Sequence, residues 1–230
     1  MHQFTIALLL VSCASAWGQT DVPRLPGSGS SIAAFIPDRW LPLDTATGDL
    51  NNDQRDDVVL VLQCMDTIPG DTTGMDRSGP VAPPRKLVVL FAATDGYRLA
   101  LDNDRFILRA DEGGWFDPFE GVVVKDGRLM LSFYGGSAWR WGHGYAFRHG
   151  DNGFELIGAE VAHYHASTGE GEARSIDFIA GRMKVTSGNI TEDEEQNVRT
   201  IWKDLPPAPL RTFDTFVRPF TWQFDADLTL

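Results

Sequence analysis

The chain has 230 residues, of which 43% are hydrophobic, and its formal net charge of −12 corresponds to a pI of about 4.7. This length and composition predict one domain, or at most two, with enough apolar residues for a buried core. The acidic excess argues against nucleic acid as a partner, because binding phosphates needs clustered Lys and Arg. Cations and basic proteins are the partners that this charge favours.

Residues 1–16 have the character of a secretory signal and are set apart from the fold. Residues 4–11 form an apolar run that is too short to span a bilayer as a mature helix. Two cleavage sites compete. The sequence Ala14-Ser15-Ala16 suits signal peptidase, whereas residues 10–13 (LVSC) have the form of a bacterial lipobox, in which Cys13 is lipidated and becomes the new N-terminus.

Residues 17–31 are rich in Pro, Gly and Ser and predict a flexible tether, so a single globular domain is expected over residues 32–230. Cys64 is the only cysteine beyond the signal, and no internal disulfide can form. We interpret Cys64 as a buried apolar residue that follows a strand.

The signals within the domain are nearly all β. Two apolar runs, DDVVLVLQC and RKLVVLFAA, predict strands. Turn signals that predict hairpins stand at Asp95-Gly96, Asp126-Gly127, Asn152-Gly153 and Ala180-Gly181. This rhythm predicts an all-β fold of antiparallel meanders, arranged as a propeller, sandwich or barrel. The blades of a propeller would be short or incomplete, because the repeat is shorter than a four-stranded blade.

Three segments interrupt this rhythm. Residues 66–85 form a long insertion rich in Pro and Gly, of a length that is either functional or mobile. Residues 191–205 (TEDEEQNVRTIWKDL) favour one or two helical turns or, equally, an acidic loop. The aromatic C-terminal residues 206–230 predict a closing strand that ties the chain end into the first sheet.

The most informative polar stretch is GDLNNDQRDDVVLVL, residues 48–62, in which acids crowd the start of a predicted strand. Calcium is a hard cation that takes six to eight oxygen ligands. Alternate positions supply such oxygens, from the side chains of Asp49, Asn51, Asp53 and Asp57 and from the backbone carbonyl of Arg55. The alternative is a solvated acidic turn. We expect a Ca²⁺ ion that stiffens the start of the strand and takes no part in catalysis, with the Arg55 side chain pointing to solvent.

The spacing of this loop resembles the calcium loops of FG-GAP and VCBS repeats, which form the blades of integrin-type propellers. Their pattern, D-x-[DN]-x-D-G-x-x-D followed by an apolar strand, is matched except that Gln54 replaces the glycine. A residue other than Gly must adopt an unfavourable backbone conformation there. Leu60 stands where an EF-hand has its glutamate, so a helix-flanked EF-hand is not expected.

A second informative stretch is SFYGGSAWRWGHGYAF, residues 132–147. The Gly-Gly-Ser sequence predicts a tight exposed turn, and Trp, Tyr and Arg beside it are the residue types that dominate protein–protein hot spots. The alternative is a set of core aromatics on either side of a hairpin. The candidate partner-binding residues are Tyr134, Gly135, Gly136, Ser137, Trp139, Arg140 and Trp141.

No motif commits the chain to catalysis. Ser137 lacks the G-x-S-x-G context of a nucleophile elbow. His163 and His165 point the same way on a predicted strand, but no third metal ligand accompanies them. Glu170 and Glu172 are candidates for an acid–base pair, without other glycosidase signals.

Taken together, the lipobox, the calcium loop, RADEGGWFDPFEGVVVKDGRLMLSFYGGSAWRW and YHASTGEGE resemble the periplasmic immunity proteins of bacteria-killing type IV secretion systems, over most of residues 38–190. This resemblance implies a calcium-bearing, propeller-like β protein that inhibits a peptidoglycan hydrolase with lysozyme-like activity. It implies that a loop, for which residues 134–141 are the candidate, enters the active-site cleft of the hydrolase. The expected location is the periplasm, with attachment to the outer membrane if Cys13 carries lipid.

Two other interpretations remain open. One is a calcium-stabilised envelope module that binds glycan or protein. The other is a secreted hydrolase that uses the region of His165 and Glu170.

Overall fold

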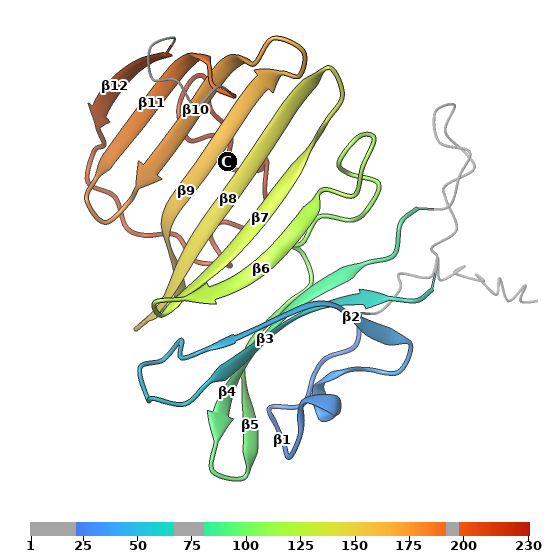
Figure 1. The fold of residues 1–230 in the computed structure, drawn as a ribbon. Helices are drawn as coiled ribbons and strands as arrows, with labels where there is room; N and C mark the ends of the chain where they lie inside the picture. The colour runs from blue at the N-terminus through green and yellow to red at the C-terminus, as the bar shows by residue number, and fades with distance from the viewer. Residues whose placement is uncertain (1–21, 67–80, 192–197) are drawn as a thin grey trace, which may run out of the picture.

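The computed structural model describes residues 22–66, 81–191 and 198–230, which form two antiparallel β-sheets (Figure 1). The five-stranded sheet has the order β1-β5-β4-β3-β2 and consists of β1 (Ser28–Gly29), β2 (Trp40–Gly48), β3 (Asp57–Cys64), β4 (Arg85–Ala93) and β5 (Gly96–Asn103). A 3₁₀ helix, η1 (Ile32–Phe35), lies between its first two strands in sequence.

The seven-stranded sheet is a continuous meander with the order β12-β11-β10-β9-β8-β7-β6. Its strands are β6 (Phe119–Lys125), β7 (Arg128–Gly136), β8 (Trp139–Gly150), β9 (Gly153–His165), β10 (Glu170–Asp177), β11 (Arg182–Asn189) and β12 (Val198–Asp204). The predicted all-β fold of antiparallel meanders is confirmed, whereas a division of the strands into propeller blades is not.

The four predicted hairpin turns each join neighbouring antiparallel strands. The turn between β6 and β7 shows why the sequence predicts them. Asp126 and Gly127 both have positive φ, 52° and 69°, which suits a type I′ turn whose twist matches that of the strands.

One hydrophobic core fills the space between the two sheets. Phe106 lies at its centre, with its ring centroid 4.9 Å from Phe213 and 5.5 Å from both Tyr145 and Phe147. Strands β3 and β4 are buried on both faces, because a second, smaller cluster covers the opposite face of the five-stranded sheet. Cys64 ends β3 as a buried free thiol, as predicted.

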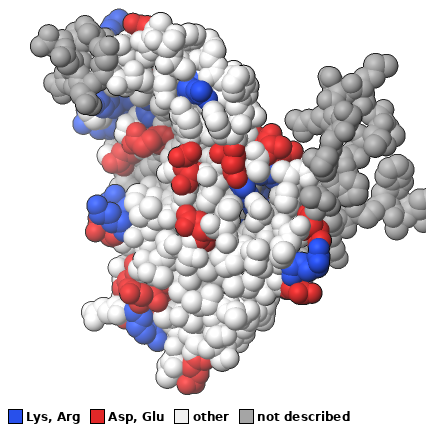
Figure 2. Space-filling view, turned by 45° about the vertical axis from the view of Figure 1, so that its right-hand side comes forward, with Lys and Arg blue, Asp and Glu red and all other residues white. Residues whose placement is uncertain are grey.

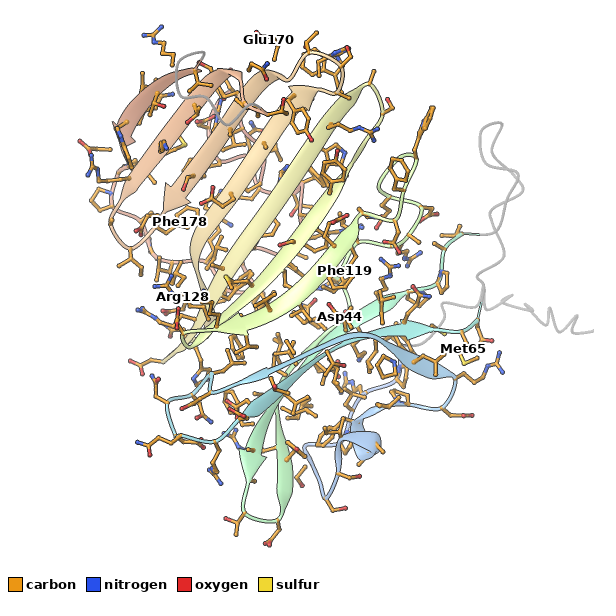
Figure 3. The ribbon with its side chains drawn as sticks, in the orientation of Figure 1. Asp44, Met65, Phe119, Arg128, Glu170 and Phe178 are labelled. Carbon is orange, nitrogen blue, oxygen red and sulfur yellow. The ribbon has the colours of Figure 1, made fainter. Side chains whose placement is uncertain are left out.

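The sheets also meet at an edge, where β2 approaches β6. The Asp44 carboxylate on β2 accepts a hydrogen bond from the amide of Val122 on β6 at 2.9 Å. Figure 3 shows Asp44 close to the point where Phe119 begins β6. This contact fixes the start of the seven-stranded sheet relative to the five-stranded one.

The C-terminal segment differs from the prediction, because residues 206–230 add no strand to the first sheet. They cross the core face of the seven-stranded sheet instead, behind it in the view of Figure 1. Phe213 stacks on Phe147 with ring centroids 4.1 Å apart, and the amide of Leu156 donates to the carbonyl of Arg211 at 2.7 Å. Proline lacks the amide that a ladder needs, and the segment has four.

The folded part also begins earlier than the predicted boundary at residue 32. Val22 and Leu25 pack against the second cluster, and β1 pairs Gly29 with Tyr97 on β5. Lys86 donates to the carbonyl of Pro23 at 2.9 Å. The segment predicted as a tether therefore contributes to the fold from residue 22 onwards.

Val198–Asp204 is strand β12, at a place where the sequence favoured helical turns or a loop. Several other predictions lie outside the described residues, namely the signal over residues 1–16 with Cys13, the first part of the tether, most of the insertion at 66–85 and the acidic residues 192–197. Within the described residues, no helix has the length and apolar character to cross a bilayer.

Candidate functional site

The turn between β7 and β8 places the predicted partner-binding residues at one end of the seven-stranded sheet. Strand register distributes them over two faces. Arg140 pairs with Tyr164, while the adjacent Trp141 pairs with His163 and therefore points to the opposite side. Tyr134 and Arg140 lie on the outer face, and Trp139 shares the core-side face with Trp141. The predicted partner-binding residues therefore lie on two faces of the sheet and do not form a single patch.

On the outer face, aromatic rings hold the guanidinium of Arg140. It lies over the Phe116 ring at 5.3 Å and the Tyr134 ring at 6.0 Å, and its Nη1 donates to the carbonyl of Gly136 at 3.2 Å. The hydroxyls of Tyr134 and Tyr164 are hydrogen-bonded at 3.2 Å. This bond and partial burial raise the pKa of Tyr164 above its ordinary value. Arg140 is consequently oriented before any partner arrives.

On the other face, Trp139 and Trp141 differ in their surroundings. Trp139 is 50% exposed and stacks on His163 with ring centroids 5.0 Å apart. Trp141 is partly buried, packs against the core and contacts Phe220 edge-to-face at 4.9 Å. Trp141 therefore has mainly a structural role, and Trp139 remains available for a partner.

The loop that precedes β6 also contributes to this site, although it was not predicted from the sequence. The amide of Gly136 donates to the carbonyl of Gly113 at 2.8 Å, and Gly114 forms an isolated bridge with Gly136. This contact brings Trp115 and Phe116, which are 79% and 51% exposed, beside the β7–β8 turn. The loop curls next to the end of β7 in Figure 1. We call the surface formed by Trp115, Phe116, Tyr134, Trp139 and Arg140 the aromatic edge.

Glycines make this contact possible because the two backbones approach closely. A Cβ atom at Gly135 would lie 2.5 Å from the carbonyl oxygen of Gly113 and 2.4 Å from the Trp141 ring. The sequence GGWF at residues 113–116 was the available signal, since paired glycines before exposed aromatics indicate a close backbone approach.

The acidic loop between β2 and β3 curls around the Asp49 carboxylate. Asp49 accepts hydrogen bonds from the amides of Asn51 and Asp53, both at 3.2 Å, and of Gln54 at 2.8 Å. Gln54 has a φ of 65°, the left-handed conformation expected where calcium loops carry glycine. The Arg55 side chain is exposed, as expected, and it also pairs with Asp53 at 2.6 Å; this hydrogen bond lowers the pKa of the Asp53 carboxyl.

Asp57 occupies a different environment from the other acids of the loop. It is fully buried, and its two carboxylate oxygens accept hydrogen bonds from the amides of Leu50 and Ala92, each at 2.9 Å. Burial raises the pKa of this carboxyl above its ordinary value, although both hydrogen bonds favour the charged form. Asp57 therefore clamps the loop to the end of β4.

The donor types of the loop fit a hard cation, because carboxylate, amide and carbonyl oxygens are the ligands that calcium prefers. No three His, Cys, Asp or Glu side chains converge as a metal site anywhere in the described parts of the chain. Two of the five predicted ligands, the Asn51 amide and the Arg55 carbonyl, are outside those residue types. Asp49, Asn51, Asp53 and Asp57 would hold the ion with the Arg55 carbonyl, while the Asp57 carboxylate also accepts the amides of Leu50 and Ala92.

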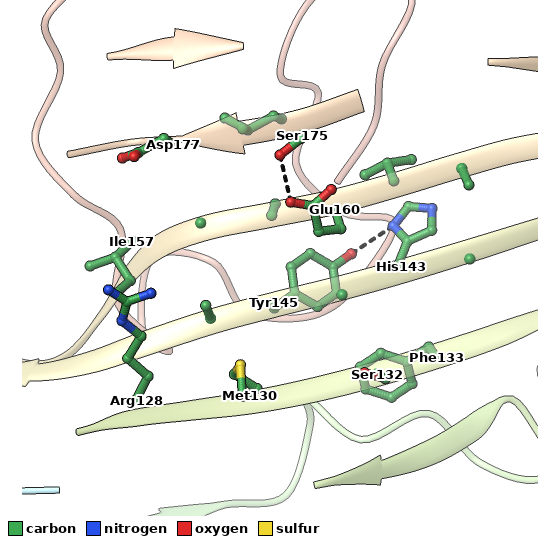
Figure 4. A pocket seen from close by; sticks show the side chains of 18 of the residues that line it. Arg128, Met130, Ser132, Phe133, His143, Tyr145, Ile157, Glu160, Ser175 and Asp177 are labelled. Carbon is green, nitrogen blue, oxygen red and sulfur yellow. Dashed lines mark hydrogen bonds between the residues drawn. The ribbon is translucent and has the colours of Figure 1, made fainter. Parts of the chain in front are cut away.

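The outer face of the seven-stranded sheet also carries a groove of about 930 Å³ (Figure 4). Small residues make its floor, namely Gly142, Gly144, Ala146, Gly158, Ala162 and Ala173. Glu160 on β9 accepts a hydrogen bond from the Ser175 hydroxyl on β10 at 2.6 Å. Partial desolvation raises the pKa of Glu160 above its ordinary value.

The residues considered for catalysis are dispersed or engaged elsewhere. His165 contacts the Ser167 hydroxyl at 3.1 Å, and Glu172 accepts a hydrogen bond from Arg174 at 2.5 Å. Glu170 is exposed at the upper end of the sheet (Figure 3). His163 is used in the stack with Trp139. Of these contacts, only that of His165 with Ser167 joins a hydroxyl to an imidazole, and within the described residues no hydrogen bond orients that imidazole through its other nitrogen.

No protein-family model and no curated protein matches the chain. The functional conclusion therefore depends on the geometry of the sites. On the face shown in Figure 2, acidic and basic side chains are interspersed and no continuous basic patch is visible.

Proposed function

We propose that the protein is a periplasmic immunity protein, which binds a lysozyme-like peptidoglycan hydrolase and inhibits it by placing the aromatic edge in its active-site cleft. The observation that carries this proposal is the arrangement of Arg140 between Phe116 and Tyr134. Aromatic rings around an oriented Arg are typical of the centre of a protein–protein interface.

Electrostatics support the same partner class. A chain with net charge −12 attracts a basic enzyme over long range, which raises the association rate more than the affinity. The catalytic groups of glycan hydrolases are carboxylates, with which an Arg side chain forms bidentate hydrogen bonds. An acidic inhibitor with an oriented guanidinium at its aromatic edge therefore suits a basic enzyme with an acidic cleft.

Two features implied by the family resemblance belong to the proposal. The first is a Ca²⁺ ion in the loop of Asp49, Asn51 and Asp53, which would stiffen the start of β3; the oxygen donors and the curled backbone support it. The second is a propeller-like arrangement with short blades, of which the two antiparallel meanders support only the coarser part, an all-β fold. Lipidation of Cys13 would keep the inhibitor at the outer membrane, where incoming hydrolases act.

The test is an inhibition assay with purified lysozyme-type peptidoglycan hydrolases, in which clearing of a cell-wall suspension is followed. Inhibition at near-equal stoichiometry is expected. Tyr134→Ala and Trp139→Ala should weaken inhibition while the melting temperature stays unchanged. Clearing by the protein alone would identify it as a hydrolase instead, and normal inhibition by both variants would show that the β7–β8 turn does not make the inhibitory contact.

The groove on the outer face supports a second candidate function, a calcium-stabilised envelope module that binds glycan. Its glycine and alanine floor leaves room for a flat ring, and Glu160 with Ser175 offers hydrogen bonds to hydroxyl groups. Retention of the protein on a peptidoglycan column without inhibition of any hydrolase would favour this function.

A further inference from the structure

Trp115 is the most exposed large hydrophobic residue among those that the structure describes, at 79%; the next is Trp202, at 59%. An indole in water is unfavourable, because about 25 cal/mol is gained for each Å² of apolar surface removed from it. A partner that covers Trp115 would therefore remove most of the indole ring from water.

The backbone on both sides of Trp115 is held in place. On the N-terminal side, the carbonyl of Gly113 accepts the amide of Gly136 at 2.8 Å. On the C-terminal side, Asp117 pairs with the buried Arg85, whose Nη1 lies 2.7 Å from the carboxylate. The carbonyl of Pro118 accepts the amide of Tyr134, also at 2.8 Å. Gly114, Trp115 and Phe116 lie between these attachments, and Gly114 itself bridges to Gly136, so little conformational entropy would be lost when a partner binds the two aromatic residues.

Beside Trp115 and Phe116 lies Arg140, a cationic side chain without an acidic partner in the described chain. Arg140 lies over the ring of Phe116, and no carboxylate of the described residues forms an ion pair with it. Other arginines of the described chain, such as Arg98 and Arg128, also lack an ion pair. Arg140 differs from them in having two aromatic rings, of Phe116 and Tyr134, against its guanidinium. Arg forms bidentate hydrogen bonds with a carboxylate, and a partner with a carboxylate beside an apolar slot would satisfy both groups at once.

We propose that Trp115, rather than a residue of the β7–β8 turn, is the leading side chain of the aromatic edge. It enters a slot shaped for a sugar ring in the cleft of a glycan hydrolase while Arg140 pairs with a carboxylate beside that slot. This assignment rests on the proposed inhibitory function and names the residues that make its central contact. In this arrangement the Tyr134 ring packs against Arg140, and Trp139, on the other face of the sheet, lies at the periphery of the interface.

The assignment is tested by titrating wild-type protein, Trp115→Ala, Trp115→Phe and Trp202→Ala against purified lysozyme-type hydrolases that the wild type inhibits. Trp202 is a matched control, since it is also an exposed Trp beside an arginine, with Arg182 lying 4.8 Å over its ring. We expect Trp115→Ala to weaken inhibition about 30-fold or more, as truncation of a hot-spot residue does. Trp115→Phe should recover most of this loss, and Trp202→Ala should inhibit like the wild type.

Both Trp residues are exposed, so equal melting temperatures are expected for all variants and exclude unfolding as the cause. If Trp115→Ala inhibits as well as the wild type, or if Trp202→Ala loses as much, Trp115 is not the leading residue although the inhibitory function stands. If the wild type inhibits none of the hydrolases, the proposed function fails and the assignment fails with it.

Discussion

The amide of Gly136 donates a hydrogen bond to the carbonyl oxygen of Gly113 at 2.8 Å, and this bond joins the β7–β8 turn to the loop before β6. The two segments are more than twenty residues apart in sequence, and neither alone forms the aromatic edge. Their close approach requires glycine on the turn side. The geometry of the candidate interface therefore depends on direct backbone contact between the β7–β8 turn and the loop before β6.

Gly135→Ala should disrupt this contact. The new Cβ would lie 2.5 Å from the Gly113 carbonyl and 2.4 Å from the Trp141 ring, so the loop must move away. We expect a loss of about 1–3 kcal/mol in the free energy of unfolding, as for other overpacked sites, together with weaker inhibition. Urea denaturation measures the first effect, and the cell-wall assay measures the second.

Gly27→Ala is the matched control for this variant, because an added Cβ there meets nothing within 4 Å. It should leave both measurements unchanged. A Gly135→Ala protein as stable as the wild type would show that the two segments are not in close contact.

Asp57→Asn should destabilise the protein through the clamp that Asp57 makes. An amide side chain accepts with one oxygen only, so one of the two buried backbone amides, of Leu50 or Ala92, loses its partner. The expected cost is about 1–3 kcal/mol, the penalty of an unsatisfied buried donor, measured by urea denaturation in the presence of a chelator.

Asp56→Asn provides the control, since it makes the same change of charge at the adjacent, exposed position. It should change the free energy of unfolding by less than about 0.5 kcal/mol. Equal destabilisation by the two variants would mean that net charge, rather than the hydrogen bonds of Asp57, is responsible.

Calcium should raise the melting temperature of the chelated protein. A ligand that binds only the folded state stabilises it by roughly 2.7 kcal/mol at a hundredfold excess over its dissociation constant, which corresponds to about 5–10 °C for a domain of this size. The stabilisation should be lost in Asp49→Asn, which removes a charged ligand, and retained in Asp56→Asn. A melting temperature that does not respond to millimolar calcium would argue for a solvated acidic turn.

Local features of the sequence predicted much of the fold. The Asp126-Gly127 turn was predictable because both residues tolerate positive φ, and β4 because its apolar run is continuous. The path of the C-terminal segment could not be predicted, because its aromatic residues indicate burial but do not indicate which sheet they cover. Its prolines, which disfavour a ladder strand, were the signal available.

The candidate site was predicted in part. Successive side chains of a strand point to opposite faces of the sheet. The sequence alone therefore predicts that Trp139 and its neighbour Arg140 lie on different faces. The position of Trp115 could not be predicted from the sequence, because it depends on a tertiary contact between Gly113 and Gly136 that no local pattern encodes.

His143 should make stability depend on pH. It is buried among the rings of Trp141, Tyr145 and Phe220, with its Nδ1 2.8 Å from the Tyr145 hydroxyl, and burial lowers its pKa from 6.5 to about 4. Between these values the unfolded chain binds a proton that the folded chain does not, so stability falls as the pH drops from about 6.5 to about 4. The full change contributed by His143 is roughly 3 kcal/mol.

Urea denaturation at pH 7 and pH 5 of the wild type, His143→Gln and His165→Gln measures this contribution. Acidic groups also titrate below pH 6, so the comparison between variants, rather than the wild-type curve alone, isolates the imidazole. His143→Gln cannot bind the proton and should lose less stability on acidification than the wild type. His165→Gln, at a less buried position on β9, should lose as much as the wild type. Parallel pH profiles for His143→Gln and the wild type would mean that the His143 ring titrates normally in the folded protein, and that the packing around Phe220 admits water.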